Sequence, residues 1–377
     1  MDTQKHIHLI NFCRKLTVNT LFFLIPLHLL KIGLSGWQIG AVVSFYGLAP
    51  LIFSFPIGWI NDRLSIRRII QSALLILSLL FLLLAITKNF YLLVVIFLFL
   101  GIANNALDVS TNSLYYKDET HVDLNKKYGT LAFWLALGTA TGTLSGGTVV
   151  HFSDFRLLFY VYAIFLLVVL MFAKKVGREK FHVVTLREYR LNLINKKTIL
   201  FSILIFTLAL HWGAEGTVYS PFLKSYFHLN NLQLSLYISI SLFFLAFSGL
   251  AIAFLRFNAQ INQRIFLFAL FLSGAGHILM VNHNVYVSLF FRIIHEIGDG
   301  LMGALIFLFI SRLFQKKNIG GSSGILLALM TLGHMVGALV FSSIGYRVGL
   351  EYPFILSGLL LIANSVYGAF IFKKISY

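Results

Sequence analysis

The sequence predicts an all-α membrane protein with twelve transmembrane helices in two similar six-helix bundles. Three observations lead to this fold class. The 377 residues are 58% hydrophobic and only 11% charged, whereas soluble domains carry about 25% charged residues. Apolar stretches of about 20 residues, long enough to cross a bilayer, recur along the whole chain. The second half of the chain also repeats features of the first half at a constant offset.

The apolar stretches follow one another with short connections. They lie near residues 8–30, 37–60, 68–87, 90–114, 128–151, 156–173, 199–223, 232–255, 264–282, 286–311, 319–345 and 352–372. The first has no small-residue cleavage site and leads directly into the second, so we interpret it as a span and not as a removed signal peptide. The longest polar insertion lies at the midpoint. It predicts a first bundle at 1–173, a central cytoplasmic loop at 174–198 and a second bundle at 199–377.

The excess of basic residues, a formal net charge of +17, indicates an orientation in the membrane. With a cytoplasmic amino terminus, most basic residues lie on the inner connections, and the outer connections hold only Lys31, Lys88, Arg156, Lys224 and Arg347. This asymmetry places both termini in the cytoplasm and fits a plasma-membrane protein that contacts anionic lipid. No groove sequence of aromatic and basic residues accompanies the charge, so we expect no nucleic-acid partner.

An internal repeat supports the two-bundle plan. A shift of 195 residues aligns two separate regions of the chain with their later copies, pairing Pro26 with Pro221, Gln38 with Gln233, Gly129 with Gly324, Gly138 with Gly333 and Gly142 with Gly337. Proline and glutamine are rare in this composition, so a shared offset indicates duplication. Two parallel six-helix halves are typical of a transporter whose substrate site lies between the halves near the middle of the membrane.

A charged loop follows the second predicted span. Its marked residues are Gly58, Asp62, Arg63, Ser65, Arg67 and Arg68. The spacing resembles the loop between spans two and three of the major facilitator superfamily, Gly-x-x-x-Asp-Arg-x-Gly-x-Arg-Arg, with serine in place of the second glycine. The resemblance covers essentially the full length and implies the fold of that superfamily. It also implies that Gly58, Asp62, Arg63, Arg67 and Arg68 form a conformational latch on the cytoplasmic face. Alternatively, these basic residues only anchor the orientation.

The fifth predicted span carries glycines at regular spacings. They are Gly129, Gly138, Gly142, Gly146 and Gly147. Small residues let membrane helices approach closely, so we expect tight helix packing here. The pattern also resembles the antiporter motif of the superfamily, with Thr143 where proline is usual, and this resemblance implies export in exchange for protons. The fourth span has Phe97 where drug-exporting members carry arginine, which speaks against multidrug transport.

Polar and ionisable side chains fall inside four predicted spans, where they are costly and usually face a cavity or one another. Our candidates for substrate binding or proton coupling lie on spans one, four, seven and ten. They are Arg14, Asn105, Asp108, His211, Glu215, Arg292, Glu296 and Asp299. In the superfamily these four spans line the central cavity, so the resemblance implies a site among them.

The depth of each side chain along its helix predicts two ion pairs. At about 1.5 Å per residue, Arg14 and Asp108 share a depth toward the inside of the membrane. Glu215 and Arg292 share a depth toward the outside. The remaining acids of span ten are then less fully compensated, and burial raises the pKa of such a carboxyl toward the range that a proton carrier needs.

We therefore expect secondary active transport of a small solute by alternating access, through proton-coupled export. Polar residues also form stripes on the faces of these spans, such as Asn105, Asp108 and Asn112 on the fourth span. These stripes favour an alternative, proton-coupled uptake of a polar solute such as a sugar. A membrane enzyme or scaffold without transport is a further alternative, although no enzymatic site and no nucleotide-binding glycine loop with lysine is present. We expect a monomer without cofactor or metal. The single cysteine, Cys13, excludes a thiolate metal cage, and His277 and His334 fit packing positions.

Overall fold

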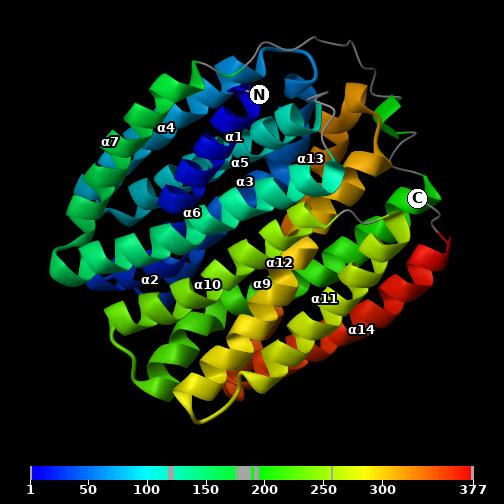
Figure 1. Cartoon of the computed structure of the whole chain (residues 1–377). Helices are drawn as coiled ribbons and strands as arrows, with labels where there is room; N and C mark the ends of the chain where they lie inside the picture. Colours follow the sequence, from blue (N-terminus) through cyan, green and yellow to red (C-terminus); the bar gives the residue numbers. More distant parts are fainter. Residues whose placement is uncertain are drawn as a thin grey trace. The chain divides into compact units, whose positions relative to one another are not determined.

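The structure is a computed structural model that describes residues 2–117, 123–174, 176, 188–190, 195–255 and 258–374. These residues form helices and no strand, as Figure 1 shows, so the predicted all-α fold class is confirmed. The elements, in chain order, are α1 (Asp2–Arg14), η1 (Lys15–Asn19), α2 (Thr20–Lys31), α3 (Gly36–Asn61), α4 (Ile66–Ile86), α5 (Phe90–Lys117), α6 (Leu124–Phe152), α7 (Phe155–Ala173), α9 (Lys196–Phe227), α10 (Asn231–Phe254), α11 (Ala259–Leu279), α12 (Val285–Leu313), η2 (Lys316–Asn318), α13 (Ile319–Arg347) and α14 (Tyr352–Lys374).

The helices agree with the predicted spans. Each span coincides with one long helix, except that the first comprises α1, η1 and α2 together. Within the described part of the chain, nine helices are long and apolar enough to cross a membrane. The twelve predicted spans are consistent with this arrangement, and the chain is a multi-pass membrane protein.

Helix α4 shows how the composition serves a lipid environment. Leu74, Leu77 and Phe81 are fully buried against neighbouring helices, while Leu75 and Leu79 on the opposite face are exposed. A surface helix of a soluble protein would carry polar residues on that outer face. Because both faces of α4 are apolar, the exposed face is suited to lipid tails.

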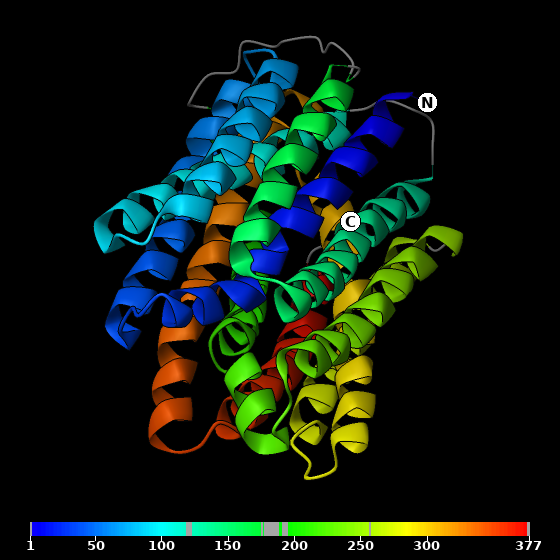
Figure 2. The same ribbon diagram turned by 90° about the vertical axis from the view of Figure 1, so that its left-hand side faces the viewer.

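The α-helix of the first predicted span is interrupted directly after the basic residue Arg14. The residues that follow Arg14 form the π-helical segment Lys15–Asn19 before the α-helix resumes, and Figure 2 shows the chain changing direction between α1 and α2. The hydroxyl of Thr17 donates to the Cys13 carbonyl at 3.0 Å, and that of Thr20 donates to the Leu16 carbonyl at 2.6 Å. Hydroxyl groups of this kind satisfy carbonyls that a wider turn leaves without a regular partner inside a membrane.

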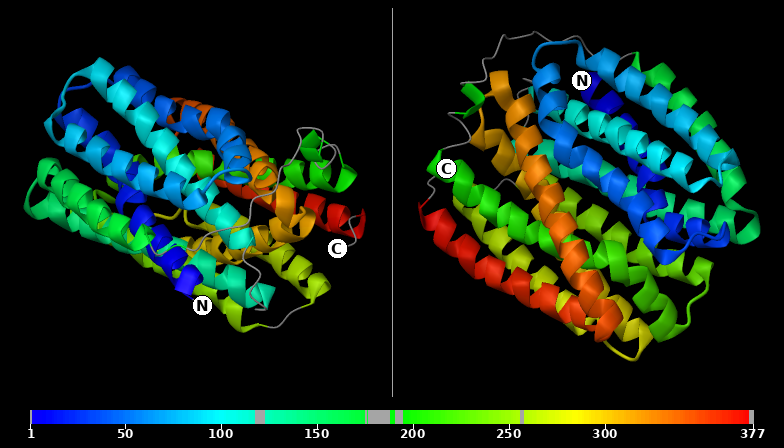
Figure 3. Two further views of the ribbon diagram at one scale, coloured as in Figure 1. Left: turned by 90° about the horizontal axis from the view of Figure 1, so that it is seen from above. Right: turned by 180° about the vertical axis from the view of Figure 1, so that it is seen from behind.

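The chain forms two compact units. Unit 1 comprises Met1–Thr120, Thr141–Leu193 and Phe314–Ala328, and unit 2 comprises His121–Ala140, Ile194–Leu313 and Leu329–Tyr377. In unit 1, α3 packs on α5, and α4 packs on both α5 and α7. In unit 2, α12 packs on α10 and α11, and α14 packs on α9 and α11. Figure 3 shows α14, in red, beside α9 and α11.

The glutamines of the internal repeat have a structural role. Gln38 accepts the backbone N–H of Ser35 at 2.9 Å at the start of α3, and Gln233 accepts the backbone N–H of Asn230 at 3.0 Å at the start of α10. Both are capping boxes, in which the third residue of a helix bonds back to the cap residue. The repeat therefore preserves the same helix start in each half of the sequence.

The division at the midpoint of the sequence stays a prediction. Most of the expected central loop, 174–198, lies outside the described residues. One part that is described, 188–190, is helical and belongs to unit 1.

Candidate functional site

A buried arginine joins α12 to α9 in unit 2. Nη1 of Arg292 lies 2.6 Å from Oε1 of Glu215, and Nη2 lies 2.5 Å from Oε1 of Glu296. The guanidinium also lies over the ring of Tyr219, 4.3 Å from its centroid. We call Glu215, Arg292 and Glu296 the arginine network. Because a buried charge is tolerated only when it is paired, this network fixes the position of α12 against α9.

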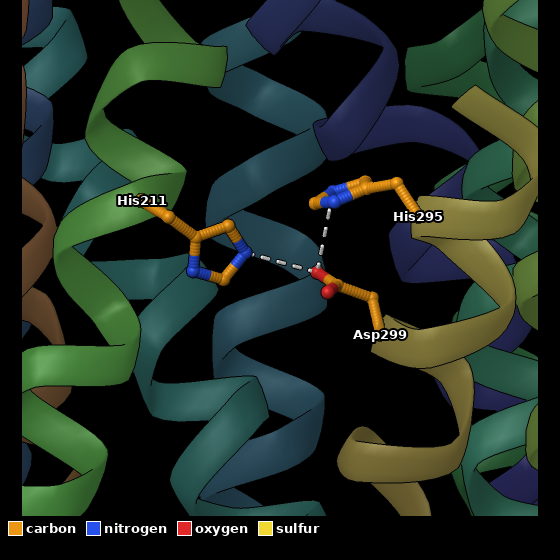
Figure 4. A group of neighbouring side chains, drawn as sticks. All are labelled: His211, His295 and Asp299. Atoms are coloured by element: carbon orange, nitrogen blue, oxygen red, sulfur yellow. Dashed lines mark hydrogen bonds and ion pairs between the residues drawn. The ribbon is translucent and has the colours of Figure 1, made fainter. Parts of the chain in front are cut away.

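Two histidines and an aspartate lie next to the arginine network. Nε2 of His211, on α9, lies 3.1 Å from Oδ2 of Asp299, on α12. Nε2 of His295, one turn before Asp299, lies 3.9 Å from the same oxygen and 2.8 Å from Oε1 of Glu215. Figure 4 shows both imidazole rings turned toward the aspartate carboxylate. We call His211, His295 and Asp299 the histidine cluster.

Further polar groups hold the aspartate of this cluster. The hydroxyl of Ser273, on α11, donates to Oδ1 of Asp299 at 2.6 Å. The indole N–H of Trp212 donates to Oδ2 at 3.2 Å. Each carboxylate oxygen therefore has a donor, and the side chain is held in one orientation.

Glycine allows α11 to reach the cluster. An added Cβ on Gly298, in α12, would lie 2.6 Å from the Ala269 carbonyl oxygen and 2.7 Å from the Ser273 nitrogen of α11. Such approaches are too short for a real side chain, so only glycine permits this helix separation. The close contact brings His277, on α11, against His295, with ring centroids 4.3 Å apart.

The residue spacing explains why these groups meet. On α12, Arg292, Glu296 and Asp299 are four and seven residues apart and share one face, while on α9, His211 and Glu215 are four residues apart. The two faces contact each other through the ion pairs described above. The Glu215 and Arg292 pair predicted from helix depth is therefore present. The acids of α12 differ from expectation, since Glu296 shares Arg292 and Asp299 contacts two histidines.

Unit 1 holds a smaller polar cluster. Nη2 of Arg14 lies 2.9 Å from Oδ1 of Asp108, which is the second ion pair predicted from helix depth. Nη1 of the same guanidinium donates to Oδ1 of Asn104 at 3.1 Å, and Asn104 donates to the hydroxyl of Tyr46 at 2.9 Å. We call Arg14, Asn104 and Asp108 the unit 1 cluster. Arg14 is fully buried, and its Nε has no hydrogen-bond partner in the structure.

The predicted stripe on α5 is partly reassigned. Asn112 donates to Oδ1 of Asp108 at 3.3 Å, as the stripe implies. Asn105 instead accepts a hydrogen bond from the hydroxyl of Ser54, on α3, at 3.0 Å. Asn104, one position earlier, lies beside Arg14, because it precedes Asp108 by four residues and so shares its face.

The loop after α3 positions a buried carboxylate at the start of α13. Oδ2 of Asp62 accepts the hydroxyl of Tyr189 at 2.7 Å and the backbone N–H of Gly321 at 2.9 Å. Oδ1 lies 2.7 Å from Nζ of Lys117. Burial and the neighbouring Asp62 carboxylate raise the pKa of the Tyr189 hydroxyl, so this group remains a proton donor. The latch was expected to combine Asp62 with arginines of its own loop, whereas the ion pair of Asp62 among the described residues is with Lys117.

The arginines of the same loop take separate positions. The guanidinium of Arg63 lies over the ring of Trp59, 4.0 Å from its centroid. Arg67 and Arg68 lie in the first turn of α4. Gly58 lies against α13, where an added Cβ would overlap the backbone of Gly320 and Gly321. The latch role of this loop stays a prediction.

The glycines of α6 serve close packing. A Cβ on Gly142 would overlap the backbone of Leu16, and one on Gly146 would overlap the side chain of Thr20. A Cβ on Gly129 would lie 2.6 Å from the backbone nitrogen of Ala253, in α10.

The candidates predicted from the sequence did not include His295, His277 or Tyr189. His295 precedes Asp299 by four residues, a spacing that was visible in the sequence. His277 was expected to be a packing residue, yet its Nε2 lies 3.8 Å from Oε1 of Glu215. Tyr189 comes from the central segment, where no sequence pattern indicates its contact with Asp62.

The whole chain resembles known transporters. The family model of the Major Facilitator Superfamily matches residues 7–255 and 201–376. None of the curated proteins matches the chain. Among solved structures, the crystal structure of the human organic anion transporter MFSD10 (TETRAN) matches with a TM-score of 0.83 and 15% sequence identity, covering 97% of this chain and 99% of that chain. At this identity the similarity shows the fold.

Proposed function

The chain belongs to the Major Facilitator Superfamily and is a secondary transporter, and we propose that it exports a small solute in exchange for protons by alternating access. The observation that carries this proposal is the buried charge on the four helical regions expected to line the site. The unit 1 cluster lies on α1 and α5, and the arginine network and histidine cluster lie on α9 and α12. Packing alone requires no charged side chains at these depths.

The imbalance of charge in unit 2 supports coupling to a cation. This part of unit 2 holds three carboxylates and a single guanidinium: Arg292 contacts Glu215 and Glu296, and Asp299 contacts only imidazoles among the ionisable groups described. A negative excess inside a membrane is unfavourable unless a cation compensates it. A proton that binds and leaves with each cycle supplies part of that compensation.

The unit 1 cluster supports a polar or negatively charged solute. Arg14 and Lys15 both interact with the carboxylate of Asp108, so two cationic groups oppose one anionic group. An organic anion, the class named for the similar human transporter, fits this balance. The hydroxyl and amide groups beside Arg14 also support the alternative of proton-coupled uptake of a polar solute such as a sugar.

We further propose that Asp62 acts as the latch of the transport cycle, with both termini in the cytoplasm of a plasma-membrane monomer. Its carboxylate joins the start of α13, the central segment and the end of α5 through three different donors. Release of these contacts would free the three elements together. The proposed division into bundles at 1–173 and 199–377 gives the two bodies that would move.

Transport into vesicles of defined pH tests this function. Purified protein is reconstituted with a trapped pH-sensitive dye, and a panel of organic anions and sugars is added under an imposed pH gradient. We expect one class to move protons in the direction opposite to the solute. Solute and proton movement in the same direction would establish the uptake alternative, and a pH gradient without effect on any transported solute would contradict proton coupling.

A further inference from the structure

The histidines in unit 2 share one feature of their hydrogen bonding. Nδ1 of His211 bonds to the carbonyl oxygen of Leu208. Nδ1 of His295 lies 2.9 Å from the carbonyl oxygen of Ser273 and 2.9 Å from its hydroxyl, which gives its own proton to Asp299. In both rings Nδ1 therefore carries the proton, because its partners can only accept it.

The opposite nitrogen of each ring then faces a carboxylate. A neutral imidazole with a proton on Nδ1 presents a lone pair at Nε2. The lone pair of His211 then faces Asp299, and that of His295 faces Glu215 at 2.8 Å, with Asp299 at 3.9 Å. A lone pair and a carboxylate repel each other at such distances, so each contact requires a cation at Nε2, either a second ring proton or a metal ion.

The net charge of the surrounding side chains gives the positive charge that the bound cation must supply. With neutral imidazoles, the three carboxylates near Arg292 exceed its single positive charge by two. One divalent ion would balance this excess. It would also replace both lone-pair repulsions with coordinate bonds.

We propose that His211, His295 and Asp299 form a binding site for a divalent transition-metal ion such as Zn²⁺. The ligand atoms Nε2, Nε2 and Oδ2 lie within 4.8 Å of one another. Zinc bonds of about 2.0–2.1 Å in tetrahedral geometry require ligand atoms about 3.3 Å apart, and the separations from Oδ2 are 3.1 Å and 3.9 Å. The planes of the two imidazole rings meet at 75°, so the rings are not stacked and both can approach one ion beside the aspartate (Figure 4).

The surroundings of the three ligands match those of known metal sites. A histidine that binds a metal usually donates its other ring N–H to a carbonyl or carboxylate, which fixes the ring. Leu208 and Ser273 provide such acceptors here. The Ser273 hydroxyl and the Trp212 indole orient the carboxylate of Asp299. The ligand set leaves a fourth position for water or a transported group.

A second combination of ligands fits less well. Glu215, His277 and His295 also place their ligand atoms within 4.8 Å. The rings of His277 and His295, however, are stacked with an interplanar angle of 26° and centroids 4.3 Å apart. Each lone pair lies in the plane of its own ring, so two nearly parallel planes cannot share one ion. His277 is fully buried and its Nε2 has no hydrogen-bond partner, so it lies beside the site as a neighbour of Glu215.

Metal binding to the purified full-length protein tests this site without transport. Protein in detergent micelles is freed of metal with a chelator and titrated with Co²⁺, whose visible absorption reports the ligands, and then with Zn²⁺ in competition. We expect one equivalent of Co²⁺ to bind with the spectrum of nitrogen and oxygen ligands, and Zn²⁺ to displace it. Absence of saturable Co²⁺ binding would overturn the proposal while leaving the proposed transport function intact.

Variants assign the ligands. His211→Gln, His295→Gln and Asp299→Asn should each weaken binding by about 100-fold or more, since loss of an outer-shell partner alone typically costs 10–100-fold. His28→Gln is the matched control, because it removes a buried histidine of unit 1 that packs on Phe155 and Phe159 and should retain the wild-type affinity. Weak binding in His277→Gln with normal binding in His211→Gln would refute the assignment in favour of the second combination.

A variant that gains a new absorption band distinguishes loss of a metal ligand from unfolding of the protein. Asp299→Cys keeps a ligand atom near the place of the carboxylate oxygen, and the longer metal–sulfur bond of about 2.3 Å makes up part of the shorter reach. This variant should bind Co²⁺ and add a sulfur-to-metal absorption band that the wild type lacks. Elution of each variant as a monodisperse species establishes its fold. A folded Asp299→Cys protein that binds Co²⁺ without the new band would exclude Asp299 as a ligand.

Discussion

The charged clusters of the two units differ in their balance. In unit 1, Arg14 pairs with one acid and otherwise contacts neutral amides. In unit 2, Arg292 is shared by two acids, and a third acid contacts two imidazoles. The internal repeat predicts that the two halves of the sequence arose by duplication, yet the charged clusters of the two units differ in sign. Unit 1 is suited to a polar or anionic group, and unit 2 is suited to a cation.

Substitution of Arg292, the arginine shared by two acids in unit 2, should have the largest effect on this difference between the units. Arg292→Ala would leave Glu215 and Glu296 buried without a partner, and loss of one member of a buried pair costs about 3–5 kcal/mol. We expect a large fall in thermal stability in detergent and complete loss of transport. The double variant Glu215→Arg with Arg292→Glu should recover part of the stability, and no recovery would show that the pair itself is not the cause.

The equivalent change in unit 1 should have a smaller effect. Arg14→Ala leaves only Asp108 without its ion-pair partner, and the side chain of that aspartate is 23% exposed, so water can partly compensate. We expect a destabilisation of about 1–3 kcal/mol, as for an unsatisfied buried polar group. The sharper readout is solute affinity, which should fall more in Arg14→Ala than in Asp108→Asn. Equal losses in the two variants would argue against an anionic or polar solute in unit 1.

The two units also differ in the polar contacts that join the ends of their helices. Unit 1 uses the charged Asp62 beside Lys117, whereas unit 2 uses a neutral pair, Asn125 and Asn262, whose amides bond reciprocally at 3.1 Å. Asp62→Asn removes the ion pair, and we expect a loss of about 1–2 kcal/mol with a marked fall in transport rate. Asn262→Asp is the matched change in unit 2. If it impairs transport as strongly as Asp62→Asn, charge at the first loop is not the decisive property.

The smallest expected effect concerns the central segment. Tyr189→Phe removes one hydrogen bond to Asp62 and keeps the ring, whose edge packs on Phe55. A net loss of about 1 kcal/mol is typical of one hydrogen bond. Thermal stability should fall slightly, and the transport rate should change by a few fold without a change in solute affinity. An altered affinity would place this tyrosine near the solute and not at the latch.

Hydropathy and charge predicted the larger part of this structure. Apolar length alone located the spans, because only a helix satisfies its own backbone groups in lipid. Helix depth predicted that Arg14 meets Asp108 and that Glu215 meets Arg292. Such predictions succeed when each helix has one ionisable group at a given depth.

Helix depth does not predict a contact when several ionisable groups can pair with the same partner. It also does not predict a contact that depends on which face of the helix a side chain occupies. Depth does not specify which acid shares Arg292, so the contact with Glu296 was missed. Asn104 and Asn105 have almost the same depth, and only their faces differ. His277 reached the cluster through the close approach of α11 and α12 at Gly298, which depends on tertiary packing.

The π-helical segment Lys15–Asn19 lets the first membrane-spanning region contact two different helices, α5 and α7. Each residue of an α-helix turns the chain by about 100°, and a wider turn shifts the phase of every side chain that follows. The face that carries Arg14 toward α5 is thereby uncoupled from the face that carries His28 against Phe155 and Phe159 of α7. The π-helical segment shifts the angular position of the side chains about the helix axis. Substitutions in α1 can therefore change its contacts with α5 without changing the contacts of α2 with α7.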